Sequence, residues 1–383
     1  MEYVMLKDVC AINMGQSPDS DSYNDNGEGV PFFQGNADFG ERYPVTRKWC
    51  SAPTKMAFSE DILISVRAPI GAVNYAREEC CIGRGLAALT PDKTKVSSEF
   101  IFWLLKGKND ELNSKGTGST FKAIGRKVLE ETKVPNIPLE KQLECSEILE
   151  KVYAVIQHRK SEIQMMDDLI KARFVEMFGN PVNNEKGFVK APMGDYMTLL
   201  TDFSSNGSYK TLDSGVTMYD EPNYAWMVRT TDLESGDMTS IKYIDENAYE
   251  LLAKSKIYGG EIIMNKIGSA GKIYLMPQID MPASLGRNAF MFRYDDRINV
   301  KFLYHLLTSE YGQREIQQYV RGAVTKTITK NDARAVLIMV PPIELQNEFE
   351  AFVNQVDKSK VAIQKALDET QLLFDSLMQQ YFG

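Results

Sequence analysis

The segment PLEKQLE at residues 138–144 returns as PIELQNE at residues 342–348, and this duplication decides the expected fold. Around it, residues 118–179 align without a gap onto residues 322–383 at an offset of 204, with eleven identities in sixty-two positions. Composition alone would give about four identities over such a length. The sequence therefore predicts one module that is present twice, each copy closing on the same type of segment.

Both copies of the segment show the apolar spacing of a coiled-coil strand. From residue 149 to 177, and again from 353 to 381, the same register recurs at alternating intervals of three and four, which predicts two long helices. Pro138 and Pro342 suit the first turn of each helix, and about 38 residues at 1.5 Å per residue give a rod of roughly 55–60 Å. Two such strands in one chain most simply pair with each other. The predicted seam residues are Leu149, Val152, Ile156, Ile163, Met166, Ile170, Val353, Val356, Ile363, Leu367, Phe374 and Leu377.

The two blocks that precede the helices also correspond, more weakly. Residues 61–71 resemble residues 261–271, and Ile82-Gly83-Arg84 resembles Leu285-Gly286-Arg287. Both blocks contain short β-type runs broken by Gly, Asn and Pro, with a short amphipathic helix near the end. We therefore expect an α+β protein with two globular domains of mixed strands and short helices, separated by the two long helices. The predicted boundaries are 1–137 for the first globular domain, 138–179 for the first spacer helix, 180–341 for the second globular domain and 342–383 for the second spacer helix.

Composition limits the class of protein. The longest apolar runs fall short of the roughly 20 residues that a bilayer span needs, and the N-terminus lacks a basic signal-peptide start, so we expect a cytoplasmic protein without membrane contact. Five cysteines show no Cys-x-x-Cys pair, and His158 and His305 are the only histidines. Zinc-ligand spacing is therefore absent, and the cysteines are expected to be reduced packing residues.

The net charge of −8 argues at first against a nucleic-acid partner, because phosphate contacts need Lys and Arg. Most of the net negative charge, however, lies in the two helical blocks: seven bases against nine acids over 137–186, and three against seven over 341–383. Residues 115–127 carry four bases and no acid. Because the local field matters more than the total charge, DNA binding stays open.

The sequence shows no catalytic centre. Neither a glycine-rich cofactor turn nor the Asn-Pro-Pro-aromatic or Asp-Pro-Pro-aromatic motif of a base-modifying methyltransferase occurs, since Asn180-Pro181 follows a helix. The run Gly116 to Thr120 lacks the Walker pattern and is interpreted either as a mobile loop or as a basic segment near DNA phosphates. We expect no enzyme activity, no bound cofactor and no metal.

In order and duplication these segments resemble the specificity subunit of type I restriction-modification enzymes. The resemblance is carried by Gly118-Ser119-Thr120-Phe121-Lys122-Ala123-Ile124 before the first helix, by the repeated Pro-x-Glu-x-Gln at 138–142 and 342–346, and by Phe178-Gly179 and Phe382-Gly383, which close the helices. Residues 61–71 and 261–271 are similar to the family's Gly-Asp-apolar strand, although neither copy has the glycine.

The resemblance implies a non-catalytic subunit whose two target recognition domains each read half of a split site in double-stranded DNA. It further implies that the helices pack antiparallel as an intramolecular coiled coil and dock two methyltransferase subunits, which would bind S-adenosylmethionine. Restriction would require further motor-nuclease subunits.

Base edges are read by Arg, Lys, Asn and Gln, so the predicted DNA contacts are polar residues in divergent or basic loops. These are Gln34, Asn36, Arg67, Arg84, Lys122, Arg126, Arg229, Arg287, Asn288, Lys326 and Lys330. Each also has a structural interpretation as a turn or a surface salt bridge, and Arg84 and Arg287, at matching positions, could serve the shared scaffold. Two alternatives remain: a coiled-coil adaptor that binds only proteins, and an enzyme with an unfamiliar site.

Overall fold

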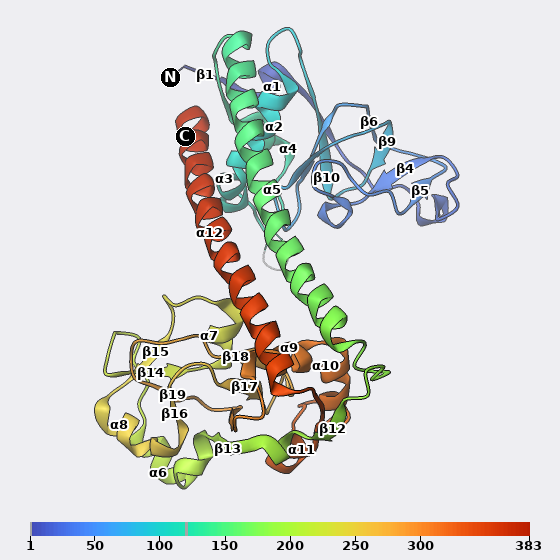
Figure 1. Ribbon diagram of the computed structural model, residues 1–383. Helices are drawn as coiled ribbons and strands as arrows, with labels where there is room; N and C mark the ends of the chain where they lie inside the picture. The colour runs from blue at the N-terminus through green and yellow to red at the C-terminus, as the bar shows by residue number, and fades with distance from the viewer. Residues whose placement is uncertain (1, 119–121) are drawn as a thin grey trace. The chain divides into compact units, whose positions relative to one another are not determined.

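The computed structural model describes residues 2–118 and 122–383, and Ser119, Thr120 and Phe121 of the first repeated segment lie outside the described residues (Figure 1). The chain divides into two compact units. The first unit consists of residues 1–162 with 363–383, and the second of residues 163–362. Each long helix thus contributes one half to each unit.

The first unit contains a four-stranded antiparallel sheet, a five-stranded sheet and a two-stranded pair, in the orders β2-β10-β7-β8, β3-β5-β4-β9-β6 and β1-β11. Within the five-stranded sheet β4 and β9 are parallel. The strands are β1 (Tyr3–Met5), β2 (Cys10–Met14), β3 (Tyr23–Asn24), β4 (Val30–Phe33), β5 (Trp49–Cys50), β6 (Met56–Ala57), β7 (Ile62–Ser65), β8 (Val73–Tyr75), β9 (Cys80–Ile82), β10 (Leu86–Pro91) and β11 (Lys133–Pro135).

The second unit repeats this plan, with the sheet orders β13-β20-β17-β18, β15-β14-β19-β16 and β12-β21. Here β14 and β19 form the parallel pair. The strands are β12 (Val189–Pro192), β13 (Met197–Asp202), β14 (Ala225–Val228), β15 (Lys242–Ile244), β16 (Lys256–Ile257), β17 (Ile262–Asn265), β18 (Ile273–Leu275), β19 (Ala283–Leu285), β20 (Ala289–Tyr294) and β21 (Leu337–Val340).

Short helices accompany the sheets in both units. In the first unit they are α1 (Leu6–Val9), α2 (Ser98–Gly107), α3 (Asn109–Ser114) and α4 (Arg126–Glu130), and in the second α6 (Tyr209–Gly215), α7 (Thr230–Ser235), α8 (Glu246–Leu251), α9 (Val300–Thr308), α10 (Glu310–Gln317) and α11 (Lys330–Ala335). Single 3-10 turns lie at Ser20–Ser22, Asn36–Asp38, Met193–Tyr196, Phe203–Asn206 and Ala253–Ser255. The predicted α+β class is confirmed.

The two long helices are α5 (Leu139–Phe178) and α12 (Ile343–Phe382). They begin at residues that match under the offset of 204. Because the compact units cut across both helices, the predicted division into four domains remains a prediction.

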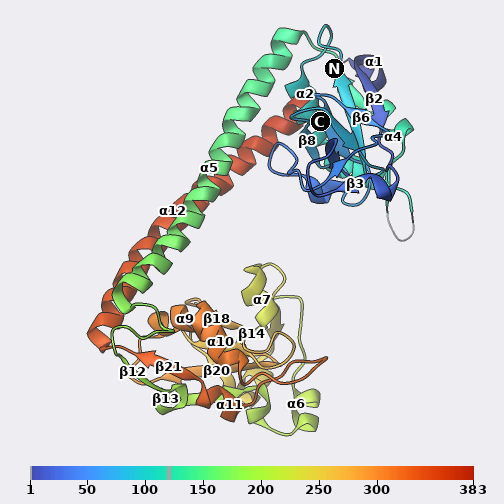
Figure 2. The ribbon, with the colours of Figure 1, turned by 90° about the vertical axis from the view of Figure 1, so that its right-hand side faces the viewer.

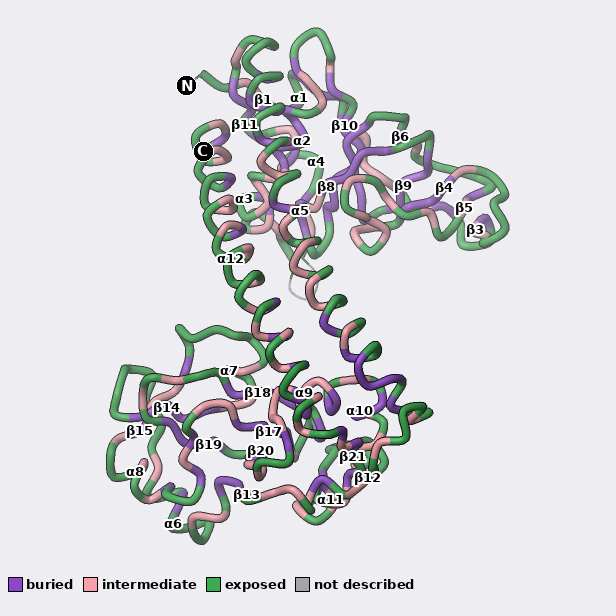
Figure 3. Tube along the Cα trace, in the orientation of Figure 1, coloured by how far each residue is buried: buried purple, intermediate pink, exposed green. Residues whose placement is uncertain are grey.

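Within each unit the halves of α5 and α12 run side by side and antiparallel (Figure 2). In the first unit Arg159 donates hydrogen bonds to the Ala366 carbonyl and the Thr370 hydroxyl, and the Tyr153 ring lies 6.0 Å from that of Phe374. In the second, Lys360 pairs with Asp167 and Arg173 with Glu348. Of the twelve predicted seam residues, seven are buried and five half-buried, while the outer faces of both helices are exposed (Figure 3).

A repeated glutamine joins each long helix to its sheet region. Gln142 accepts a hydrogen bond from the Ser97 amide at 2.9 Å, and Gln346 accepts one from the Asn299 amide at the same distance. Ser97 and Asn299 are the N-caps of α2 and α9. Both glutamine side chains are buried, and buried amides need such partners. This contact accounts for the glutamine in both copies of the segment that first revealed the repeat.

The phenylalanine that closes each long helix lies in a core. Phe178 packs 4.7 Å from Phe302 of α9, and Phe382 packs 5.1 Å from Phe100 of α2. Both closing rings are nearly or fully buried. The end of α5 therefore completes the second unit, and the end of α12 completes the first.

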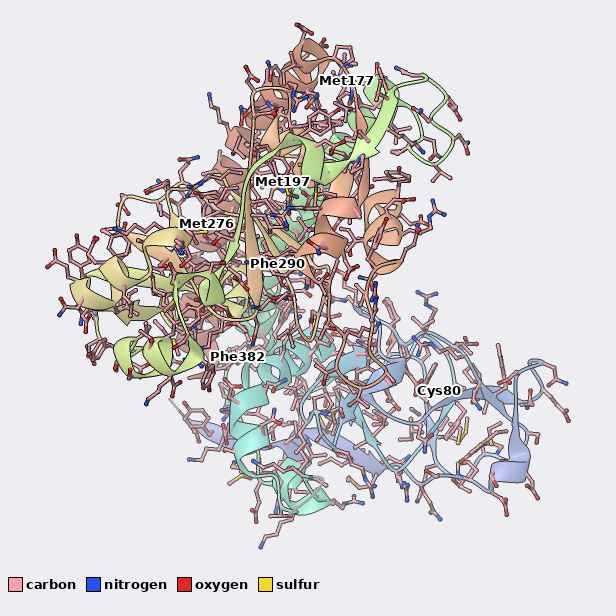
Figure 4. All side chains as sticks on the ribbon, turned by 90° about the horizontal axis from the view of Figure 1, so that it is seen from below. Cys80, Met177, Met197, Met276, Phe290 and Phe382 are labelled. Carbon is pink, nitrogen blue, oxygen red and sulfur yellow. The ribbon has the colours of Figure 1, made fainter. Side chains whose placement is uncertain are left out.

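The five cysteines are free and buried, as the sequence predicts, and Cys80 lies among the strands of the first unit (Figure 4). Burial raises the pKa of the Cys80 thiol to about 12, so it stays protonated at neutral pH. No helix in the described part of the chain is both long and apolar enough to cross a bilayer.

Candidate nucleic-acid interface

Four backbone segments of the first unit meet in one hydrogen-bonded array. The Gly83 amide donates to the Phe33 carbonyl at 2.8 Å, the Val66 amide to Gly85 at 2.9 Å, and the Ala68 amide to Lys122 at 3.0 Å. We call this array, formed by residues 33–36, 66–68, 83–85 and 122–124, the first loop ridge. Three of its segments follow the ends of β4, β7 and β9, and β4 and β9 are parallel, so their ends meet at one edge.

The second unit contains the same array in the same order. The Gly286 amide donates to Val228 at 2.8 Å, the Lys266 amide to Asn288 at 2.8 Å, and the Gly268 amide to Lys326 at 2.9 Å. We call residues 228–230, 266–268, 286–288 and 326–328 the second loop ridge. The repeated scaffold thus extends to loops that have little sequence in common.

The ridges bring together most of the predicted contact residues. Gln34, Arg67, Arg84 and Lys122 lie on the first ridge and are exposed. Their structural counterparts on the second are Arg229, Ile267, Arg287 and Lys326. An aspartate caps the turn that follows each of Gln34 and Arg229, since the Gln34 amide donates to Asp38 at 2.7 Å and the Arg229 amide to Asp232 at 3.1 Å.

Two further predicted residues lie on the ridges, and the last two lie close to them in the chain. Asn36 is half-buried in the 3-10 turn after Gln34, and Asn288, exposed, follows Arg287 with a φ of 68°. Arg126 and Lys330 are the first residues of the equivalent helices α4 and α11. All eleven predicted residues therefore lie on the ridges or close to them in the chain, and their contact with DNA stays a prediction.

The residues on either side of the segment before α4 and α11 pair in the same way in both units. Thr117 and Ala123 exchange backbone hydrogen bonds at 3.0 and 2.9 Å, and Arg321 and Thr327 do so at 2.9 and 2.7 Å. Gly118 and Gly322 both have positive φ, which favours glycine at this turn. Lys122 and Lys326 are thereby held at the ends of matching loops. Ser119 and Thr120, part of the run predicted as a loop or a phosphate-contacting segment, lie outside the described residues.

In the second unit several of these cations are held by acids of the same unit. Asp202, which is 8% exposed at its side chain, pairs with Lys266 and Lys330, each at 2.8 Å. Burial opposes ionisation of Asp202, but the hydrogen bonds from Lys266, Lys330 and Ser205 outweigh it and lower its pKa to about 2. The carboxylate is therefore charged at neutral pH.

Two arginines of the second ridge are also paired. Arg229 forms an ion pair with the buried Asp232 and donates a further hydrogen bond to the Ser240 carbonyl at 2.8 Å. Arg287 lies 3.0 Å from Asp213, and its guanidinium lies 5.1 Å from the Phe203 ring centroid. For these arginines the interpretation as scaffold or salt-bridge residues gains direct support.

The cations of the first ridge are paired with acids less often than those of the second ridge. Among residues 2–118 and 122–383, no acid forms an ion pair with Arg67, Arg84 or Lys122, while Arg126 pairs with Glu130 at 2.8 Å in an exposed helical pair. The strand registers show that Met14 and Val66 of the first unit occupy the positions equivalent to Asp202 and Lys266 of the second. The first ridge therefore presents cations that its own unit leaves uncompensated.

Sequence reasoning missed a basic loop beside the first ridge. Arg47, Lys48 and Lys55 are exposed, and the Lys48 and Lys55 carbonyls accept the amides of Phe32 and Ile82 at 2.9 and 2.8 Å. The signal was local, since residues 42–59 contain four bases and no acid. A count of charges over short windows of the sequence identifies this loop.

No group of three or more His, Cys, Asp or Glu side chains in the described ranges has the geometry of a metal site. The ridges offer hydrogen-bond donors, amides and positive charge at strand ends. Such groups can contact phosphates and the edges of bases.

Comparison with known proteins identifies a matching family and several similar proteins. A family model, the type I restriction modification DNA specificity domain, matches residues 1–165 and 195–370. The putative type I restriction enzyme MjaX specificity subunit of Methanocaldococcus jannaschii is 45% identical over 156 residues, which cover 41% of this chain and 37% of that protein. The chain thus spans little more than a third of that relative in the match.

Two further relatives match along the whole chain. The type I restriction enzyme EcoBI specificity subunit of Escherichia coli is 20% identical over 402 aligned residues, covering 98% of this chain and 83% of that protein. The crystal structure of a type I restriction-modification system S subunit from M. genitalium matches with a TM-score of 0.59 at 16% identity, covering 100% of this chain and 96% of that one. At that identity the structural match shows the shared fold alone.

Proposed function

The chain belongs to the type I restriction modification DNA specificity family, as a specificity subunit, and from this membership we propose that each of its units reads one half of a bipartite site in double-stranded DNA. The first loop ridge would read one half-site and the second loop ridge the other. In this proposal the chain itself is not catalytic.

One observation carries the proposal: the two ridges share their backbone hydrogen bonds but differ in two of four matched side chains, Gln34 against Arg229 and Arg67 against Ile267, while arginine (Arg84, Arg287) and lysine (Lys122, Lys326) recur at the other two. A common scaffold presents Gln34, Arg67 and Arg84 in one unit, and Arg229, Ile267 and Arg287 in the other. A repeated framework with different polar groups is what two readers of different base sequences require.

We further propose that the long helices dock two methyltransferase subunits. Apolar side chains project from their outer faces, including Leu143, Met165, Val361 and Leu372, which are 54%, 64%, 70% and 70% exposed. Contiguous apolar patches mark surfaces that a protein partner covers, and we propose that these side chains contribute to such a surface. S-adenosylmethionine would bind to those partners, and restriction subunits would join them where the system also cleaves DNA.

The test is to co-express the chain with candidate methyltransferase subunits and to map the methylated sites. We expect a split recognition sequence. Replacing residues 1–137 by the corresponding block of a relative should change one half-site and preserve the other, and a change in both would refute independent reading.

A second measurement separates this function from that of a protein-only adaptor. The affinity of the assembled complex for duplex should fall steeply as salt rises, because phosphate contacts release counterions. A complex that forms but binds no duplex at low salt would favour the adaptor.

A further inference from the structure

An aromatic cluster fills the junction between helices and sheet in the first unit. It consists of Tyr75, Phe102, Trp103, Tyr153 and Phe374, which come from β8, α2, α5 and α12. The Trp103 ring lies 5.3 Å from Tyr153 and 5.7 Å from Phe374, and Phe102 stacks on Tyr75 at 4.7 Å. Trp103 is fully buried.

Two cations cover this cluster. The Arg42 guanidinium lies 5.0 Å from the Phe102 ring centroid and pairs with Glu150 of α5 at 2.6 Å, and the Lys106 ammonium lies 3.8 Å from the centroid of Tyr153. Burial lowers the pKa of Lys106 to about 8. In the first unit, rings and cations of the chain itself therefore occupy the junction between the helices and the sheet.

The equivalent positions of the second unit carry smaller side chains. Leu275 replaces Tyr75 and His305 replaces Trp103 when β8 and α2 are matched to β18 and α9, and Asp357 and Ile170 replace Tyr153 and Phe374 at the offset of 204. Only Tyr304, in place of Phe102, is not smaller.

These five replacements line one open groove of about 750 Å³. The groove lies entirely within the second unit, between α5, α9, α12 and the end of β18. We call it the anchor groove. The groove lies at the positions of the second unit whose equivalents in the first unit carry the aromatic rings.

The walls of the anchor groove suit an apolar, planar group. Ile170 and Val353 are buried apolar side chains on its walls, and His305 packs edge-on against Phe349 at 5.4 Å. Burial lowers the pKa of His305 to about 4, so its imidazole is uncharged at neutral pH.

The rim carries two ion pairs, Lys301 with Asp357 and Lys360 with Asp167. Its charges are balanced, which disfavours a polyanion. Apolar walls with a balanced polar rim are typical of the pockets that receive aromatic anchors in protein interfaces.

We propose that the anchor groove receives an aromatic side chain of the methyltransferase subunit that docks on the second unit. This inference rests on the proposed function, because it names the surface through which that partner is held. The first unit supplies the equivalent rings itself, so the two docked partners are held unequally. Only the partner on the second unit inserts a ring.

The first experiment uses the full chain and N-acetyl-L-tryptophanamide, with N-acetyl-L-alaninamide as the control ligand. The chain has two histidines, and His158 is exposed on α5 away from the groove lining, so the ring resonances of ¹⁵N-histidine form an internal comparison. We expect a saturable shift of His305 with the tryptophan derivative alone and no shift of His158. An unmoved His305 at saturating ligand would overturn the proposal.

The second experiment fills the groove with the ring that the first unit has. Asp357→Tyr installs the counterpart of Tyr153 and leaves His305 in place. Lys358→Tyr adds the same ring one residue away at an exposed position outside the groove lining. D357Y should weaken methyltransferase binding at least tenfold and abolish the His305 shift, whereas K358Y should do neither. Leu275→Tyr fills the groove from β18 and repeats the test if D357Y fails to fold.

The outcomes separate the two proposals. If the methyltransferase subunit binds D357Y, L275Y and K358Y as tightly as the unaltered chain, the anchor groove is refuted while the docking function stands. If the unaltered chain binds no methyltransferase subunit, the docking function itself fails, and with it the inference.

Discussion

The two loop ridges share their backbone hydrogen bonds and differ in how far their cations are paired with acids. In the second unit Asp202 holds Lys266 and Lys330, whereas in the first unit Met14 and Val66 occupy two of these three places and Arg126 is left at the surface. Around the second ridge most cations are paired with acids, whereas Arg67, Arg84 and Lys122 of the first ridge have no ion-pair partner among the described residues. The comparison teaches that a basic residue at a matching position is not by itself a matching contact.

The largest expected effect concerns the closing phenylalanines. Phe178→Ala should destabilise the second unit and Phe382→Ala the first, each by roughly 3–5 kcal/mol, because each change removes a buried ring from a core. Hydrogen exchange resolved by unit would measure this. Equal loss of protection in both units after either change would show that the two cores are not separately completed.

Breaking the buried ion cluster comes next. Asp202→Asn should cost the second unit about 2 kcal/mol at neutral pH, which corresponds to a pKa lowered from 3.8 to about 2. Because the folded-state pKa is depressed, this stability is present above pH 4 and is lost as pH falls from about 4 through 2. Denaturant unfolding at several pH values should show a smaller loss in D202N than in the unaltered chain, because Glu234, Asp237 and Asp295, whose pKa values are also lowered, still titrate in both.

A double replacement, which introduces the first ridge's residues into the second, tests the ion cluster again. D202M combined with K266V installs the side chains of the first ridge, and well-packed apolar groups often replace a buried ion pair without loss. The double variant should therefore regain most of the stability that D202N loses. A double variant as unstable as D202N would mean that the second ridge requires the ion cluster.

A third effect is expected in DNA binding. Arg84→Ala should weaken duplex binding by the assembled complex roughly tenfold, within the range of about 1–3 kcal/mol for an arginine base contact. Arg287→Ala should cost less, because Arg287 must leave Asp213 and the Phe203 ring before it contacts DNA. Titration of both variants with the same methylated-site duplex would measure the difference. A greater loss in R287A would reverse the contrast between the ridges.

The smallest expected effect concerns the exposed ion pair between Arg287 and Asp213. Asp213→Asn frees Arg287 from a pair that is 43% and 58% exposed, and such pairs contribute only about 0–1 kcal/mol. We expect duplex affinity to rise two- to threefold at low salt and the gain to vanish at high salt. A loss of affinity would assign Asp213 a positioning role.

Much of the fold was predictable because its signals are local or periodic. The duplication, the seam register and the helix start after Pro138 and Pro342 follow from spacing alone. The ridges were not predictable, because they depend on hydrogen bonds between segments far apart in the chain, such as the one from Val66 to Gly85.

The same distinction between local signals and contacts of distant segments decides which parts of the candidate site were predictable. Arg84 and Arg287 were correctly matched from a shared glycine, but nothing near Lys266 or Lys330 in sequence announces Asp202. Their pairing arises only when β13 lies beside β20, and β20 beside β17. The basic loop at residues 42–55 was within reach of sequence reasoning, since it needed only a local charge count.

The division of each long helix between the units sets an order of folding during synthesis. Residues 163–362, which form the second unit, have all been made before residues 363–383, which the first unit needs. The part of the protein that is translated first is therefore finished last. Until Phe382 reaches Phe100, the core beneath α2 lacks its last ring, so nascent chains should expose this surface to chaperones even after their second unit has folded.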